Sequence, residues 1–272
     1  MFRPVGCHVA AAREMRVTIE RRPSPACEWA SRLARFAAVL FITGGLSHRY
    51  GLLETVPFFW VLGIVGLLAV VAFGLAIAGF IDVWEHGDKG GRKALAAGLL
   101  ACVILAPFGL GGWRVFEYPR LIDVTTDTED PPSFRSLALL RPPTANAIGA
   151  IDANAAKLIE SSYPDISGRR YAVSPDRVMQ AVLAIMAERG WEVVATRGIP
   201  QQDSEITIEA RAFSRFMRFP ADVAVRLTDE DASTFVDLRS ASHYAKHDLG
   251  DNADRIGRFL TDLDMAMEAG AQ

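Results

Sequence analysis

The chain has 272 residues, half of them hydrophobic, and a net charge of −3, a length that allows one or two domains with a buried core. Residues 1–117 carry 12 Lys and Arg against 8 Asp and Glu, whereas residues 118–272 carry 17 against 24. Because nucleic-acid binding needs clustered basic residues, this acidic second part argues against nucleic acid as a partner. Cys7, Cys27 and Cys102 all lie in the first part, so the second part needs no disulfide.

The first 32 residues form an arginine-rich segment, which we predict to be a cytoplasmic tail. A cleaved signal peptide is not predicted, because no short apolar run ends in a small-residue cleavage motif. Met15 is an alternative start to Met1, since the residues before it show no structural pattern.

Residues 33–113 are predicted to be a transmembrane region. Residues 56–81 contain no charged side chain, and residues 94–113 form a second uncharged run. A spanning helix needs about 20 apolar residues, so both runs are long enough. Residues 33–50 are a shorter candidate span carrying Arg35, whose side chain would have to reach the headgroups. The sequence leaves open whether this first span crosses fully.

The charge distribution favours three spans over two. The loop between the long spans carries Lys89, Arg92 and Lys93, which the positive-inside rule places in the cytoplasm. Three spans put the arginine-rich N-terminus in the cytoplasm as well, whereas two spans would put it outside. We therefore expect a multi-pass protein of a bacterial inner membrane, with the residues after 114 in the periplasm. The uncharged interiors of the long spans indicate an anchor rather than a transport pathway.

The C-terminal half is predicted to be an arm followed by a soluble domain. Residues 114–173 are rich in proline and are expected to form an extended arm, with a short helix near residues 146–161. Residues 174–272 are expected to form an α+β domain. Its pattern predicts a helix near residues 174–190, four strands, and a last helix over about residues 252–267. Short connections predict an antiparallel sheet of about four strands with helices on one face.

The other face of the predicted sheet carries charged residues on three neighbouring strands. Two interpretations remain open: a solvent-facing surface with cross-strand ion pairs, or a polar groove whose arginines hold an anionic group. Just after the last strand, residues 237–258 concentrate polar and charged side chains at a strand-to-helix junction. This junction is where we expect a functional site.

Several ordered motifs resemble a known family. They are RSASHYAKHDLGDNADRI at residues 239–256, IDVTTDTEDPPSF at residues 122–134, the Tyr163-Pro164-Asp165 run, and RFPADVAVRL at residues 218–227. Together they cover about residues 118–268 and resemble the bacterial and plastid family known as domain of unknown function 1499. The chain departs from the family at His243, where arginine is typical, and at Ala221, where a second aspartate is often found. The resemblance singles out nine candidate ligand-binding residues: Asp222, Arg226, Arg239, Ser240, Ser242, Lys246, Asp248, Asn252 and Arg255.

The junction also contains the ingredients of two more specific sites. His243 and His247 would share one face of a helix and offer an alternative metal site, although no HExxH spacing or cysteine pair accompanies them. Ser240 or Ser242, with one of these histidines and an aspartate, would supply the residue types of a catalytic triad, although no Gly-x-Ser-x-Gly motif occurs. The sequence predicts no cofactor.

We therefore expect a membrane-anchored cell-envelope protein in contact with the lipid bilayer. Its periplasmic domain is expected to bind an anionic small molecule, a lipid headgroup or an envelope protein, rather than to act as an enzyme. The first alternative is an envelope hydrolase that uses the same junction. The second is a purely structural component.

Overall fold

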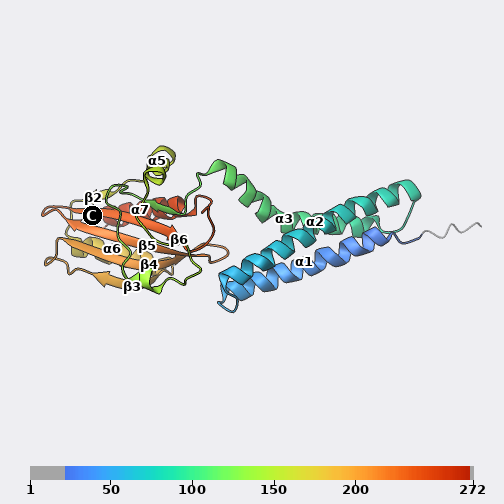
Figure 1. The fold of residues 1–272 in the computed structure, drawn as a ribbon, viewed down its shortest axis with the longest axis horizontal. Coiled ribbons are helices and arrows are strands. Elements are labelled where there is room, and N and C mark those ends of the chain that lie inside the picture. The colour runs from blue at the N-terminus through green and yellow to red at the C-terminus, as the bar shows by residue number, and fades with distance from the viewer. Residues whose placement is uncertain (1–21, 270–272) are drawn as a thin grey trace, which may run out of the picture.

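The computed structural model describes residues 22–269, so the two candidate start residues and most of the arginine-rich tail lie outside the described residues. Figure 1 shows a bundle of three long helices at one end of the molecule and a sheet with helices at the other. The bundle consists of α1 (Pro25–Arg49), α2 (Thr55–His86) and α3 (Gly91–Glu117). The other elements are β1 (Asp123–Thr125), α4 (Ser136–Leu140), α5 (Ala153–Ser162), β2 (Arg169–Tyr171), α6 (Pro175–Glu188), β3 (Glu192–Arg197), β4 (Glu205–Phe213), β5 (Pro220–Asp229), β6 (Thr234–Ser242) and α7 (Asp251–Ala269).

Among the described residues, α2 and α3 are the helices long and apolar enough to cross a membrane. They contain the two long predicted spans and extend past them at both ends, because polar residues at helix ends continue the helical hydrogen bonding. The shorter predicted span, residues 33–50, lies within α1 except for its last residue. α1 does not reach the same apolarity, so the structure supports two candidate spans and does not establish the third.

Small residues bring α1 against the other two helices. Gly79 of α2 lies so close to α1 that a Cβ added there would be 2.7 Å from Cys27 Sγ. Such close approach of backbones is typical of helices that pack through small side chains. The contact continues along the bundle as a set of buried alanines from all three helices: Ala30, Ala34, Ala72, Ala76, Ala97 and Ala101.

The sheet has six antiparallel strands in the order β1-β6-β5-β4-β3, and β2 also pairs with β6. We predicted about four strands. The additional two, β1 and β2, have three residues each and pair with residues 239–241 and 234–236 along the same edge of β6. Strands this short show no alternation of apolar and polar residues, so the pattern of the proline-rich segment did not indicate them.

The main core lies between the sheet and two helices. α6 and α7 pack on one face of the sheet, as predicted, and Trp191 stacks on Phe259 of α7 with ring centroids 5.3 Å apart. Alternate residues of β4, β5 and β6 point toward these helices, since successive side chains of a strand point to opposite faces. Fully buried members of this core include Val182, Met186, Ile208, Val225, Leu238 and Leu263.

The opposite, charged face of the sheet is covered by the proline-rich segment. Residues 126–149, the central part of the predicted arm, run across it and carry α4 (Figure 1). From here on, the name arm refers to these residues alone. Phe134 and Leu137 of the arm are buried against Ala224 and Ala241 of the sheet. Neither a solvent-facing surface nor an open groove describes this face, and helices lie on both faces rather than one. The physical reason is that the arm folds back and brings its own apolar and acidic residues onto the sheet.

Candidate functional site

Of the nine candidate residues, which lie in the junction and on β5, eight fall into two clusters separated by the sheet, and Lys246 belongs to neither. Seven of the nine are buried, namely Asp222, Arg226, Arg239, Ser240, Asp248, Asn252 and Arg255. Ser242 is half-buried and Lys246 is exposed. Neighbouring residues of β6 point to opposite faces, so Arg239 faces the arm whereas Ser240 faces α7. The structure therefore does not assemble the predicted set into one groove.

Arg226 ties the arm to the sheet. Its guanidinium donates to Asp237 on the next strand at 3.0 Å, and to Asp127 and Asp130 of the arm at 3.0 and 2.7 Å. Burial acts to lower the pKa of Arg226, but the hydrogen bonds and charges of Asp237 and Asp130 together outweigh it, so the pKa is raised and the side chain stays charged. Arg226 Nε is buried and has no partner among the described residues.

Arg239 makes a second tie and uses all three of its nitrogens. It donates to both carboxylate oxygens of Asp123, the shortest distance being 2.8 Å, and to the carbonyls of Pro132 at 3.3 Å and Gly149 at 2.6 Å. Burial raises the pKa of the Asp123 carboxyl, although the hydrogen bond and charge of Arg239 oppose the shift. These bonds use four of the five N–H groups of the guanidinium, and Arg239 is only 3% exposed, so little of it is accessible to an external ligand.

Asp222 is fully buried between an arginine and a histidine that the prediction had not paired with it. Arg141 Nε from the arm donates to Asp222 at 2.7 Å, and His243 Nε2 lies 2.8 Å from the other oxygen. Arg141 also donates to the carbonyl of Ala241 at 2.9 Å. The His243 ring therefore lies on the arm side of the sheet. It hydrogen-bonds Asp222, and not Ser240 or Ser242 as a catalytic triad would require.

Glu209, on β4, holds the start of α4 and was not among the predicted site residues. Its fully buried carboxylate accepts the backbone N–H groups of Arg135 and Ser136 at 3.1 Å each and of Leu137 at 2.8 Å. Arg197 lies 2.6 Å from the same carboxylate and pairs with it. A carboxylate at a helix N-terminus satisfies N–H groups that have no partner within the helix.

The second cluster fastens α7 to β6. Arg255 Nη1 donates to Ser240 Oγ at 2.9 Å and to Asn252 Oδ1 at 2.7 Å, and Ser240 Oγ donates to Asn252 Oδ1 at 2.8 Å. Asn252 Nδ2 donates to Ser242 Oγ at 3.0 Å. Asp248 accepts the N–H groups of Gly250 and Asn252 and so caps α7. Burial raises the pKa of Asp248, with the two N–H groups opposing the shift.

The ingredients of a triad or a metal site do not converge. Ser240 and Ser242 bond to Asn252 on the helix side, whereas His243 bonds to Asp222 on the arm side. His247 Nδ1 accepts the N–H of Leu249 at 2.9 Å. Within residues 22–269, no group of three or more His, Cys, Asp or Glu is placed to hold a metal ion.

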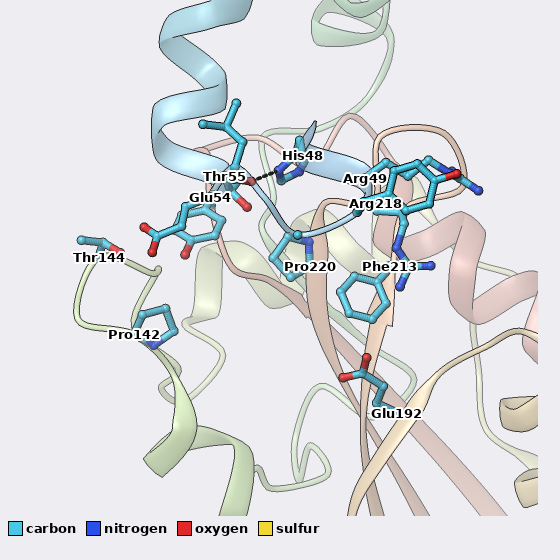
Figure 2. Close-up of a pocket in the computed structure, with 14 residues that line it drawn as sticks. His48, Arg49, Glu54, Thr55, Pro142, Thr144, Glu192, Phe213, Arg218 and Pro220 are labelled. Carbon is cyan, nitrogen blue, oxygen red and sulfur yellow. Dashed lines mark hydrogen bonds between the residues drawn. The ribbon is translucent and has the colours of Figure 1, made fainter. Parts of the chain in front are cut away.

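A cavity of about 860 Å³ lies elsewhere, between the α1–α2 connection and the nearby end of the sheet. Figure 2 shows Arg49 beside Arg218 and Phe213 on one side of this space, and Glu54 on the other side, toward Thr144 and Pro142 of the arm. We name this space the juxtamembrane cavity. Sequence reasoning missed it because its residues come from five separate stretches of the chain, and no local pattern indicates that these stretches lie together.

Four charged residues line the juxtamembrane cavity, and within residues 22–269 none of them forms an ion pair. The Arg218 guanidinium lies over the Phe213 ring at 4.2 Å, and Arg49 Nη1 donates only to a backbone carbonyl, that of Phe216, at 3.2 Å. Among residues 22–269, neither the Glu54 nor the Glu192 carboxylate has a hydrogen bond or ion pair. This distinguishes the cavity from the junction, whose charged groups bond to one another.

His48 forms one wall of the juxtamembrane cavity and is only 7% exposed. Its Nδ1 lies 2.9 Å from the carbonyl of Leu53, and its ring stacks on Phe58 with centroids 4.4 Å apart. Its Nε2 is buried and has no hydrogen-bond partner in the part of the chain that the structure describes. Buried polar atoms without a partner are uncommon in folded proteins, which sets His48 apart from the histidine of the junction that bonds to Asp222.

Comparison with known proteins identifies the family and no activity. The comparison with curated proteins found no match. The crystal structure of TTHA0849 from Thermus thermophilus is 12% identical and aligns over 39% of this chain and 97% of its own, with a TM-score of 0.21. The sequence profile described as "Protein of unknown function (DUF1499)" matches residues 123–263, from β1 into α7. Since this match spans just over half of the chain, the protein belongs to the DUF1499 family.

Proposed function

We propose that the protein is a membrane-tethered binding module of the bacterial cell envelope, and that the juxtamembrane cavity holds the phosphate of a lipid headgroup or a small anion. The observation that carries this proposal is the pair Arg49 and Arg218, which line the cavity without a carboxylate partner among the described residues. Arginine forks suit phosphate groups. The predicted class of ligand is retained, whereas the proposed binding residues move from the junction to this cavity.

Tryptophans at the two ends of the helix bundle support its placement in a membrane. Trp29 and Trp84 lie toward one end and Trp60 and Trp113 toward the other, and each is more than half exposed. Tryptophan is enriched where a membrane meets water. Trp60 and Trp84 are separated by a helical rise of about 36 Å, slightly more than the hydrocarbon thickness of about 30 Å.

Two features of α1 support the proposal that it is a third span. Its start lies beside the end of α2, where Ser24 Oγ donates to Asp82 at 2.9 Å, so the two helices run antiparallel over their length. Its outward face carries a stripe of exposed apolar residues, which lipid would solvate better than water. These residues are Phe36, Val39, Ile42 and Leu46.

In the proposed arrangement the α1–α2 connection and the domain share the periplasmic side. Figure 1 shows the domain at the end of the bundle where α1 ends and α2 begins. The α2–α3 connection with Lys89, and the start of α3 with Arg92 and Lys93, lie at the other end, which the positive-inside rule assigns to the cytoplasm of a bacterial inner membrane. The N-terminal tail would then be cytoplasmic.

Cysteine labelling in spheroplasts tests this topology. In a chain whose three native cysteines are replaced by alanine, Leu52→Cys should react with a membrane-impermeant maleimide, because Leu52 is 83% exposed on the periplasmic connection. Arg22→Cys and Lys89→Cys should react only after permeabilisation. Labelling of Arg22→Cys in intact spheroplasts would show that α1 does not cross, and the three-span arrangement would be wrong.

Binding to the juxtamembrane cavity is tested by native mass spectrometry of the full chain released from phosphatidylglycerol nanodiscs. The double variant Arg49→Gln, Arg218→Gln should retain at least about tenfold less lipid, since a hydrogen bond to a charged group contributes about 1.5–3 kcal/mol. The control is Arg170→Gln, whose exposed pair with Glu230 lies outside the cavity. Competition with inorganic phosphate separates headgroup binding from anion binding. Equal retention by the double variant and the control would remove the cavity as the site.

A further inference from the structure

The connection between β4 and β5, residues 214–219, is held against the ends of the membrane helices. We call it the β4–β5 loop. Its Phe219 ring lies 5.4 Å from the ring of Phe59 and 5.5 Å from that of His48, and the carbonyl of Phe216 accepts a hydrogen bond from Arg49. Phe59 directly precedes Trp60, so the loop lies at the level of the periplasmic tryptophans.

The β4–β5 loop has the composition of a membrane-interface segment. Its sequence, SRFMRF, combines two arginines with three large apolar residues. Phe216 is 81% exposed, and Arg215 beside it is also exposed. In water an exposed phenylalanine at a loop tip gains nothing from folding. At a bilayer surface its ring can enter the headgroup layer while an arginine contacts lipid phosphates.

The loop is also fixed in shape before it meets any partner. Ser214 N–H donates to the carbonyl of Phe219 at 2.9 Å, and Phe219 N–H donates back to Ser214 Oγ at 2.9 Å. Arg218 N–H closes a third bond, to the carbonyl of Ser214, at 3.1 Å. A preformed loop loses little conformational freedom on binding, so its apolar tip can contribute fully to affinity.

We propose that the β4–β5 loop is a second membrane anchor, which inserts Phe216 into the interfacial layer of the periplasmic leaflet and places Arg215 at the lipid phosphates. The covalent link from α3 enters the domain through residues 118–122. A second contact at the loop fixes the orientation of the domain on the bilayer and keeps the juxtamembrane cavity facing the headgroups. The inference rests on the proposed membrane crossing of α2 and is independent of what the cavity binds.

Spin-label accessibility in the full chain tests the anchor. A nitroxide is attached at Phe216→Cys in the chain lacking its native cysteines, and the protein is reconstituted into vesicles of phosphatidylethanolamine with some phosphatidylglycerol. The matched control is Ile199→Cys, 54% exposed on the β3–β4 turn at the opposite end of the sheet. Oxygen concentrates in lipid and a nickel chelate stays in water. The label at 216 should be relaxed more by oxygen, and the label at 199 more by the chelate.

The result separates the anchor from the cavity ligand. If the label at 216 is as accessible to the nickel chelate as the label at 199, the loop lies in water and the anchor proposal is overturned, even where lipid is retained in the cavity. If the label at 216 is lipid-exposed while the arginine variants retain their lipid, the anchor stands and the cavity function fails. Both positions are exposed, so neither substitution should prevent folding.

Discussion

Replacing Arg239 with alanine should destabilise the soluble domain by about 3–5 kcal/mol, as expected when one partner of a buried ion pair is removed. The substitution leaves the Asp123 carboxylate and the carbonyls of Pro132 and Gly149 without the donor they share. These groups lie just before the arm, within it and at its end, so the contact of the arm with the sheet should loosen before the rest of the domain unfolds. Arg239→Lys keeps the charge but not the fork, and should have an intermediate effect.

Two readouts on the full chain in detergent check this expectation. The thermal unfolding midpoint should fall, and amide hydrogen exchange should accelerate over residues 123–149 while α6 keeps its protection. The control is Arg170→Ala, which removes an equally short arginine–carboxylate pair, that with Glu230, at an exposed position. Its midpoint should stay close to that of the parent. Equal, small changes in both variants would contradict a buried tie at Arg239.

Long periodic elements could be predicted from the sequence with nearly correct ends. The last helix was expected over about residues 252–267 and is α7, Asp251–Ala269, because its apolar residues recur at helical spacing. The uncharged runs of α2 and α3 were equally clear. By contrast, β1 and β2 are formed by pairing with β6, and their own three residues contain too little pattern to indicate a strand.

The position of the polar junction could also be predicted, but not its burial. The sequence shows arginines on one face of the sheet, and it shows acidic residues in the proline-rich segment. What brings Arg226 to Asp127 and Asp130 is the fold-back of the arm, a tertiary contact with a sequence separation of nearly a hundred residues. The cluster of acids in the arm, Asp127, Glu129 and Asp130, opposite the arginines predicted on one face of the sheet is the signal that could have suggested this arrangement.

The juxtamembrane cavity, unlike the junction, could not be located from the sequence. Its charged residues are scattered singly along the chain, and none stands out in its own segment. Arg49 ends a helix and Arg218 sits in a hairpin loop, which are ordinary places for an exposed arginine. Only the docking of the sheet against the helix ends places them around one space. Within residues 22–269, the concentrated polar residues therefore bond to one another, whereas the charged groups around the juxtamembrane cavity, which have no charged partner, are dispersed along the chain.

Replacing Glu209 with alanine should have an effect of similar size, about 3–5 kcal/mol, because it removes a buried charge that several groups share. Three backbone N–H groups at the start of α4 and the Arg197 guanidinium would lose their acceptor inside the fold. Glu209→Gln should recover part of the loss, since the amide oxygen can still accept, but its NH₂ group would face donors.

The Glu209→Ala variant is measured in the same full-length preparation. Amide hydrogen exchange is followed at α4 rather than over the whole arm. Amide exchange at residues 135–137 should increase sharply in Glu209→Ala, and the unfolding midpoint should fall with it. Glu205→Ala is the matched control, since Glu205 lies on the same strand with an exposed side chain and should change neither readout appreciably. If residues 135–137 stay protected in Glu209→Ala, water replaces the carboxylate at little cost. The charged face of the sheet would then be more open than its buried contacts indicate. Arg226 and Arg239, the two candidate arginines on that face, would again be candidates for ligand binding.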